Sequence, residues 1–210
     1  MNLKAIVASL MAVGMLGALI VALFTQAPQA PTEETTPPVA SEVPSISGSA
    51  DAFESLYLLP KDSFAPRIQA KAANGKLVDT QAFQKKGEGT VVIFYQGVFC
   101  SVCAGQLEGF QQKASEFKKK GYNIIAISAD TLPDAQARQG KSGLSFPVIP
   151  DPDRSIISNY GAVNVTRGNI AYPTVYVIDK AGKVVFSFAD KEMTRLSAED
   201  LLKTISTLNP

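Results

Sequence analysis

The chain has 210 residues, of which 46% are hydrophobic and 19% charged, which suits one globular domain with a further segment attached. Its net charge is +1, from 20 basic and 19 acidic residues, so no global field favours a nucleic acid or another polyanion as a partner. Histidine is absent, which excludes histidine-ligated metals, histidine-bound haem and Cys-His or Ser-His catalytic pairs, and leaves thiols, carboxylates, amines and the backbone.

Residues 1–24 predict a membrane anchor or a signal sequence. Residues 5–24 run without a charge, and a helix of that length is about as long as the hydrocarbon core of a bilayer is thick. In the alternative, a cleaved signal peptide, the apolar region is usually shorter, roughly 7 to 15 residues. The small residues Ala27 and Ala30 are each followed by proline, which is unfavourable for cleavage. We therefore expect an uncleaved anchor, with secretion after cleavage as the alternative.

The charges that flank the apolar run predict its orientation. Lys4 precedes the run and Glu33 follows it, and the positive-inside rule then places the remaining chain on the extracytoplasmic side, periplasmic or extracellular. Residues 25–60, rich in proline, threonine, serine and glutamate over their first part, have the composition of a tether. Such a segment cannot bury enough apolar surface to offset the entropy lost on ordering. The folded domain is expected over residues 61–210.

Within residues 61–210, apolar runs predict strands that alternate with helices. Asn74-Gly75 predicts an antiparallel hairpin between residues 67–72 and 76–78. Further strands are expected at 90–95, 122–128, 146–149, 174–179 and 183–188, and helices at 81–86, from the cysteines to about 120, at 133–139, at 153–160 and from 197 to about 208. The expected N-caps are Thr80, Asp153 and Ser197. This order predicts an α/β fold with a mixed central sheet and helices on both faces.

The two cysteines of the chain, Cys100 and Cys103, follow the apolar run 91–95 and a glycine-containing turn. A strand followed by C-x-x-C delivers a dithiol to the first turn of a helix. The unpaired backbone N–H groups there favour thiolate over thiol. A helical spacing of 4, 3, 4 and 3 predicts one buried face, made of Cys103, Leu107, Phe110, Ala114 and Phe117. Cys100 should therefore be the exposed, attacking thiol and Cys103 the more buried partner.

The pair has three possible uses. A permanent structural disulfide would be a weak staple, because so short a loop constrains the unfolded chain little. Two cysteines cannot complete a four-ligand zinc or iron–sulfur site within one chain, although two thiolates would suit Cu(I). Redox cycling is the use that we favour, and it needs neither a metal nor an organic cofactor.

Seven segments between Phe64 and Leu208 carry a resemblance through their order and spacing: Ala65-Pro66, Asn74-Gly75-Lys76, Val91 to Tyr95, Cys100 to Cys103, Ile124 to Asp130, Phe146 to Asp153 and Pro173 to Lys183. Together they resemble the redoxin or alkyl hydroperoxide reductase/thiol-specific antioxidant branch of the thioredoxin fold. The resemblance implies that Pro173 is a cis-proline that faces the dithiol, although a trans proline at a strand start is also common. It further implies a substrate groove beside the cysteines, for which Phe99, Tyr172, Pro173 and Tyr95 are the expected residues.

The family that the chain resembles contains two chemistries, and this sequence departs from both. In peroxiredoxins, the peroxide-attacking cysteine matches Cys103, but the arginine that supports its thiolate aligns with Pro173, and Arg154 or Arg167 could replace it only if the fold brings one of them close. In thioredoxin, a buried carboxylate lies six residues before the first cysteine, where this chain has Phe94. The residues available for proton transfer instead are Glu108, Asp130 and Tyr95.

The leading hypothesis is a membrane-tethered thiol–disulfide oxidoreductase, in which Cys100 attacks a partner disulfide and Cys103 resolves the mixed disulfide. The alternative is a thiol peroxidase, in which Cys103 attacks a hydroperoxide through a sulfenic acid and Cys100 resolves it. The partner would be a protein thiol or disulfide, or a small thiol or peroxide. A copper-handling module is a third hypothesis, but related copper-assembly proteins pair C-x-x-x-C with a histidine, and this chain has neither.

Overall fold

The computed structural model describes residues 57–190 and 194–208. The predicted anchor and nearly all of the predicted tether lie outside these ranges and stay predictions. Within the described ranges, no helix is both long enough and apolar enough to cross a membrane. Leu58 and Leu59, at the end of the predicted tether, pack against the core, so packing begins slightly before the predicted domain boundary at residue 61.

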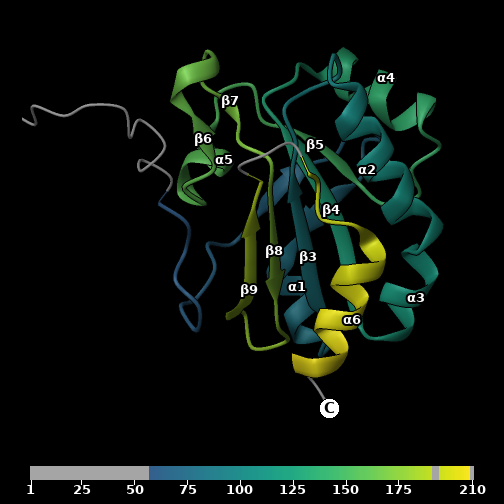
Figure 1. Cartoon of the computed structure of the whole chain (residues 1–210), viewed down its shortest axis with the longest axis vertical. Helices are drawn as coiled ribbons and strands as arrows, with labels where there is room; N and C mark the ends of the chain where they lie inside the picture. Colours follow the sequence, from purple (N-terminus) through teal and green to yellow (C-terminus); the bar gives the residue numbers. More distant parts are fainter. Residues whose placement is uncertain (1–56, 191–193, 209–210) are drawn as a thin grey trace, which may run out of the picture. The chain divides into compact units, whose positions relative to one another are not determined.

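A five-stranded mixed sheet forms the centre of the described chain (Figure 1). In spatial order its strands are β5 (Val148–Pro150), β4 (Tyr122–Ser128), β3 (Gly89–Phe94), β8 (Thr174–Ile178) and β9 (Val184–Ala189). The β3–β4 and β4–β5 pairs are parallel, whereas β3–β8 and β8–β9 are antiparallel. The predicted mixed sheet and its final hairpin are therefore confirmed.

Helices and two small sheets surround the central sheet. The helices are α1 (Thr80–Lys85), α2 (Ser101–Gln112), α3 (Ala114–Lys119), α4 (Leu132–Lys141), α5 (Ser155–Asn159) and α6 (Ala198–Leu208). The small sheets pair β1 (Gln69–Lys71) with β2 (Leu77–Asp79), the predicted Asn-Gly hairpin, and β6 (Val163–Asn164) with β7 (Ile170–Ala171); the 3-10 turn η1 (Val165–Arg167) lies between the last two.

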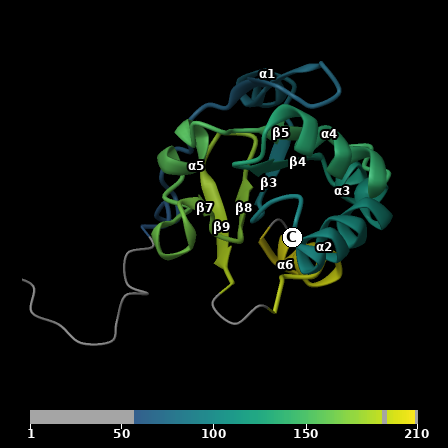
Figure 2. The ribbon, with the colours of Figure 1, turned by 90° about the horizontal axis from the view of Figure 1, so that it is seen from above.

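Strand β3 is buried on both faces, which explains the continuous apolar run from Val91 to Phe94. Because side chains alternate along a strand, Val91 and Ile93 pack with the buried residues of α2, α3 and α6, whereas Val92 and Phe94 pack with those of the β1–β2 hairpin and α5. Figure 2 shows α1 on one side of the sheet and α2 and α6 on the other. The expected covering of both faces by helices is therefore confirmed.

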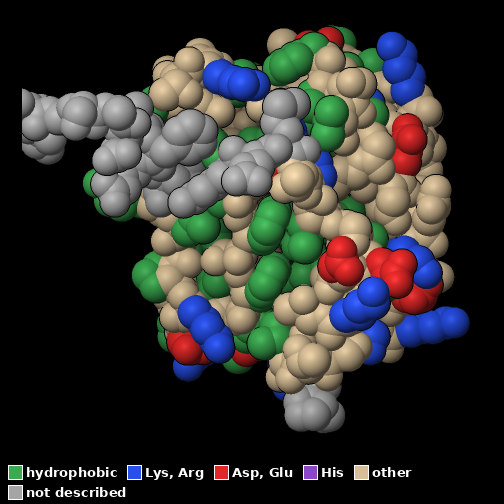
Figure 3. Space-filling view, in the orientation of Figure 1, with side chains coloured by type: hydrophobic (Ala, Val, Ile, Leu, Met, Phe, Trp, Pro, Cys, Tyr) green, Lys and Arg blue, Asp and Glu red, His purple; other side chains and the backbone are tan. Residues whose placement is uncertain are grey.

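The outer surface of α6 is charged, whereas its inner face belongs to the core. Leu201 and Ile205 are buried, and Lys203 on the exposed side pairs with Glu199 at 3.1 Å. On the face in Figure 3, hydrophobic side chains run down the middle, along β9 and beside α6, and charged side chains gather over α6. This amphipathic helix closes the sheet face on which Cys103 is buried.

The helix that follows the cysteines differs from its prediction. It is not one helix to residue 120 but two, α2 and α3, separated at Lys113, whose backbone (φ −101°, ψ 3°) leaves the helical region. The predicted buried face is nevertheless correct, because Cys103, Leu107, Phe110 and Phe117 are fully buried and Ala114 is partly buried against the same core. The rings of Phe110 and Phe117 stack with centroids 5.5 Å apart across the break.

Two of the three predicted N-caps differ from the structure. Asp79, not Thr80, caps α1 by accepting the N–H of Gln81, while the Thr80 hydroxyl accepts the N–H of Ile68 and so joins the helix to the hairpin. Ser197 caps α6 as predicted.

The cap of α5 is shared between two carboxylates. Asp151 accepts the N–H of Ile157 at 2.8 Å, and the predicted cap, Asp153, accepts only that of Ser155 at 3.3 Å. Asp151 is buried and lies directly after β5, so it can reach further into the first turn. Sequence spacing alone does not distinguish two aspartates that both precede a helix.

Candidate active site: a disulfide in contact with a buried arginine

The strand register brings four chain segments to one edge of the sheet. Phe94, the last residue of β3, pairs with Ile127 near the end of parallel β4 and with Thr174 at the start of antiparallel β8. Thr174 in turn pairs with Ala189, the last residue of β9. The residues directly after β3, β4 and β9 and directly before β8 therefore meet at this edge, and the two cysteines lie here.

Cys100 and Cys103 form a disulfide at the N-terminus of α2, with their Cα atoms 5.2 Å apart. Cys100 is the N-cap, and its sulfur accepts the backbone N–H of Cys103 at 3.1 Å. Cys103 is fully buried and Cys100 is 8% exposed. The predicted order of accessibility therefore holds, but the expectation of an exposed Cys100 is wrong, because a third side chain packs against the sulfurs.

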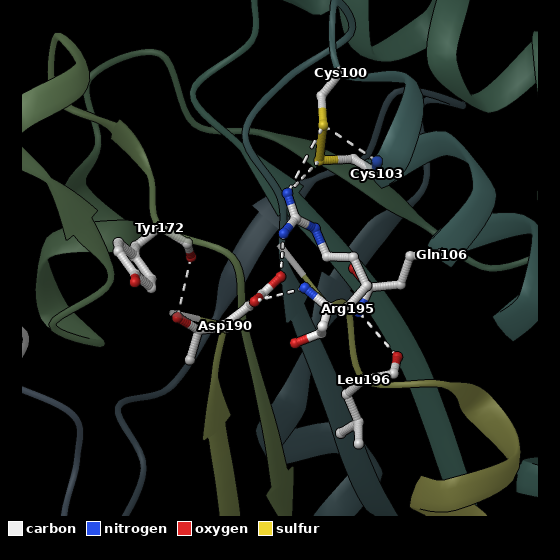
Figure 4. A network of polar contacts seen from close by, with 9 residues as sticks. Cys100, Cys103, Gln106, Tyr172, Asp190, Arg195 and Leu196 are labelled. Atoms are coloured by element: carbon white, nitrogen blue, oxygen red, sulfur yellow. Dashed lines mark hydrogen bonds and ion pairs between the residues drawn. A yellow bond between two sulfur atoms is a disulfide. The ribbon is translucent and has the colours of Figure 1, made fainter. Parts of the chain in front are cut away.

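That side chain is Arg195, which lies between β9 and α6 and contacts both sulfurs (Figure 4). Its Nη2 is 3.7 Å from the Cys103 sulfur and 4.0 Å from the Cys100 sulfur. Its Nη1 donates to a carboxylate oxygen of Asp190 in an ion pair. The side chains of Arg195 and Asp190 are only 7% and 2% exposed, so the cation at the sulfurs is shielded from water.

Three further hydrogen bonds fix the segment that carries Arg195. Asp190 accepts the N–H of Thr194 and donates its own N–H to the carbonyl of Pro173, both at 3.0 Å. The Gln106 amide of α2 donates to the Leu196 carbonyl at 3.1 Å. The arginine is thus attached on one side to the start of β8 and on the other to the helix that carries Cys103.

A second polar cluster holds the loop that leads to Cys100. The carboxylate of Asp130, just after β4, accepts the N–H of Val98 at 3.1 Å, the hydroxyl of Tyr95 at 3.2 Å and that of Ser128 at 2.8 Å. Burial raises the pKa of Tyr95 well above its ordinary value, so its hydroxyl stays protonated and can donate. Asp130 therefore meets three donors from three positions of the sheet edge.

The other side of the same loop is held by α4. The guanidinium of Arg138 donates to the carbonyl oxygens of Val98 and Cys100, the latter at 3.3 Å. Gly97 has φ +152°, and a Cβ there would lie 2.8 Å from a carboxylate oxygen of Asp130 and 2.7 Å from the Phe99 ring. Glycine is thus required at this turn by both backbone conformation and space.

The four predicted groove residues differ in accessibility. Phe99 is 69% exposed beside Cys100, whereas Tyr172, Pro173 and Tyr95 are buried. Burial raises the pKa of Tyr172. The implied cis-proline is wrong: no peptide bond among the described residues is cis, so Tyr172–Pro173 is trans, with Pro173 directly before a strand. A groove lined by these residues stays a prediction.

The arginine that contacts the sulfurs could not be identified from the sequence. Arg154 and Arg167 were the conditional replacements, but Arg154 directly precedes α5 and Arg167 ends η1, and the arginine at the sulfurs is Arg195. It lies 92 positions from Cys103 and outside every motif, so no spacing could indicate it. Of the proton-transfer candidates, Tyr95 and Asp130 bond to each other, whereas Glu108 is an exposed residue bonded to Ser142.

Comparison with known proteins adds family and fold information. The model of the AhpC/TSA family matches residues 62–187. The thiol-disulfide oxidoreductase ResA of Bacillus thuringiensis is 31% identical over 143 residues, covering 68% of this chain and 76% of the relative. The 1-Cys peroxiredoxin PER1 of Triticum aestivum is 25% identical over 155 residues, covering 68% of this chain and 70% of the relative.

Solved structures with the same fold are peroxidoxin BcpB from Mycobacterium tuberculosis and AhpC from Enterococcus faecalis. BcpB has a TM-score of 0.64 at 17% identity, covering 71% of this chain and 98% of that one. AhpC has a TM-score of 0.64 at 16% identity, covering 70% of this chain and 90% of that one. At these identities the likeness concerns the fold.

Replacing Asp130 should destabilise the protein much more than replacing Glu108. Asp130→Ala leaves three donors without their acceptor, and we expect the free energy of unfolding to fall by about 2 to 4 kcal/mol. Glu108→Ala removes one exposed hydrogen bond and should change it by less than about 0.5 kcal/mol. Urea denaturation of both full-length variants measures the difference, and equal stabilities would contradict a structural role for the Asp130 cluster.

Proposed function

The chain belongs to the AhpC/TSA family of the thioredoxin fold, and from this membership we propose that it is a thiol–disulfide oxidoreductase that cycles a Cys100–Cys103 disulfide. Its relatives are thiol-disulfide oxidoreductases and peroxiredoxins, both of which are oxidoreductases. The observation that carries the choice between them is the bonded pair at the start of α2, in which Cys100 retains 8% exposure and Cys103 is fully buried. Of the two cysteines, Cys100 is therefore the one that a partner can reach more easily, and Cys103 is already within bonding distance to resolve the adduct.

The reaction consists of two exchanges at sulfur. The Cys100 thiolate attacks one sulfur of a partner disulfide, which breaks that bond, forms a mixed disulfide and releases one partner thiolate. The Cys103 thiolate then attacks the Cys100 sulfur, forms the intramolecular disulfide and releases the second partner thiolate. The partner gains two electrons and its thiolates take up two protons, while the dithiol of this chain is oxidised. The reverse sequence oxidises a partner dithiol.

The N-cap position of Cys100 supports its role as the attacking group. Its sulfur already accepts the N–H of Cys103 at 3.1 Å, and this donor would serve a thiolate better than a neutral sulfur. Phe99, exposed beside it, offers a partner an apolar contact. Both features lie on the short segment that joins β3 to α2.

Single cysteine variants should separate the attacking from the resolving thiol. We expect the reduced full-length Cys103→Ser chain to accumulate a mixed disulfide with oxidised glutathione through Cys100, because no second thiol can resolve it. Cys100→Ser should form its adduct at least about tenfold more slowly, because its remaining thiol, Cys103, is fully buried. Intact-mass analysis over time measures both adducts.

The wild-type chain and a chain without cysteines are the controls for this experiment. The wild type should proceed to its intramolecular disulfide without retaining glutathione, and the cysteine-free chain should gain no mass. The assignment is wrong if Cys100→Ser reacts as fast as Cys103→Ser.

A second candidate function is a thiol peroxidase, and one contact favours it. The Arg195 Nη2 lies closer to Cys103 than to Cys100, and Cys103 matches the peroxide-attacking position of peroxiredoxins. The Cys103 thiolate would attack one peroxide oxygen, the O–O bond would break, and the leaving oxygen would take up a proton. Cys100 would then attack the sulfenic acid, release water and form the same disulfide.

For this second function, the two single variants should differ in peroxide consumption. Reduced Cys100→Ser should consume one equivalent of hydrogen peroxide and hold a sulfenic acid at Cys103, which a dimedone adduct would reveal by mass. Cys103→Ser should consume none. Peroxide consumption that is unchanged in both variants would refute the peroxidase.

The apolar run 5–24 supports a further proposal, that the chain is anchored in a membrane with residues 61–210 on the extracytoplasmic side. The full-length chain should remain in the membrane pellet after alkaline carbonate extraction, whereas a chain that begins at residue 25 should be released. Release of a full-length chain with an intact N-terminus would contradict the anchor. Release of a shortened chain would identify signal cleavage instead.

A further inference from the structure

The buried ion pair at the sulfurs is the strongest feature that the thiol exchange leaves without a role. We propose that Arg195 is a further catalytic residue, which stabilises the thiolates of Cys100 and Cys103 and so raises the reduction potential of the pair, with Asp190 as its positioning residue. The proposal rests on the proposed function in that the pair cycles between disulfide and dithiol.

The two ends of the Arg195 guanidinium have different tasks. Nη1 is used by the Asp190 carboxylate, whereas Nη2 is directed at the sulfurs, 3.7 and 4.0 Å away. A disulfide sulfur is a neutral and weak acceptor, and Nε is buried without a hydrogen-bond partner in the described part of the chain. In the oxidised state, the guanidinium therefore has only a weak acceptor at Nη2 and none at Nε.

Reduction changes this balance in one direction. A thiolate at either sulfur gives Nη2 a charged acceptor, and such hydrogen bonds are roughly twice as strong as neutral ones. The low exposure of Arg195 and Asp190 reduces screening by water, so the attraction is stronger than on a surface. Arg195 thus binds the reduced site better than the oxidised site, and stabilising the reduced form makes a dithiol pair more oxidising.

The surrounding contacts single out Arg195 as the cation that acts on the sulfurs. Arg138, the other buried arginine here, donates to the carbonyl oxygens of Val98 and Cys100 and thereby holds the loop. Asp190 is bonded through its backbone to Pro173, and Leu196 through its carbonyl to Gln106. Hydrogen bonds hold the two neighbours of Arg195, Thr194 and Leu196, and the ion pair with Asp190 holds its guanidinium, so the guanidinium is already in place before a thiolate forms.

Equilibration with glutathione buffers tests the proposal on the full-length chain. For Arg195→Met we expect the equilibrium constant that favours the dithiol to fall at least about tenfold, a potential about 30 mV more negative. Arg195→Lys keeps the charge but not the forked geometry and should recover part of the loss. Arg67→Met removes an exposed arginine that pairs with Asp79 beside the β1–β2 hairpin and should leave the potential unchanged.

A second readout does not depend on disulfide exchange. The thiolate absorbance of the reduced chain, followed against pH in the ultraviolet, should have its midpoint about one unit higher in Arg195→Met than in the wild type. A merely structural role would not move this midpoint. If Arg195→Met does not fold because Asp190 is left unpaired, Arg195→Met with Asp190→Asn removes both charges and should shift both readouts in the same direction by less.

The outcomes separate this proposal from the proposed function. If a folded Arg195→Met keeps the wild-type titration midpoint and an equilibrium constant within about twofold, Arg195 has no such role, whether or not Cys103→Ser traps a mixed disulfide. If the wild-type pair does not exchange with glutathione, the proposed function fails, and the titration still decides whether Arg195 stabilises a thiolate.

Discussion

The burial of β3 on both faces is the constraint on which the site depends. A strand covered on both sides is mostly apolar, as β3 is from Val91 to Phe94, and the ionisable and thiol side chains follow where the strand ends, after Phe94. Strands β4 and β9 end at the same edge, and β8 begins there. The thiols therefore lie beside the residues that follow or precede three other strands, although these are far apart in the sequence.

At this edge, buried polar groups are arranged so that each charge has a partner. Burying an ion is costly unless it is paired and hydrogen-bonded, and Asp130 meets three donors while Arg195 meets Asp190. The two clusters differ in what they hold. Asp130 and Arg138 fix the backbone of the loop before Cys100, whereas Arg195 contacts the sulfurs themselves. The loop can thus be rigid while the charge at the sulfurs changes during the reaction.

The sequence was sufficient for features that depend on local pattern. The alternation of strands and helices, the Asn74-Gly75 hairpin and the buried face of α2 follow from periodicity and turn chemistry, and all are present. The exposure of Cys100 and the identity of the supporting arginine depend instead on which distant segment packs over the site. Arg195 carries no local signal, because an arginine before a helix is ordinarily a solvated residue. Pro173 was misassigned for a related reason, since the isomer of a proline bond is decided by its tertiary surroundings.

The disulfide between Cys100 and Cys103 is the common product of both chemistries in the family, so the oxidised site alone is compatible with either. The Arg195 Nη2 lies 3.7 Å from the Cys103 sulfur and 4.0 Å from the Cys100 sulfur, so charge favours a thiolate at Cys103 only slightly. Access does separate the two chemistries. A peroxidase must bring substrate to Cys103, which is fully buried, whereas an exchange reaction needs only Cys100, which retains some exposure and lies beside the exposed ring of Phe99. The described arrangement therefore favours attack by Cys100, with Arg195 serving first the attacking and then the resolving thiolate.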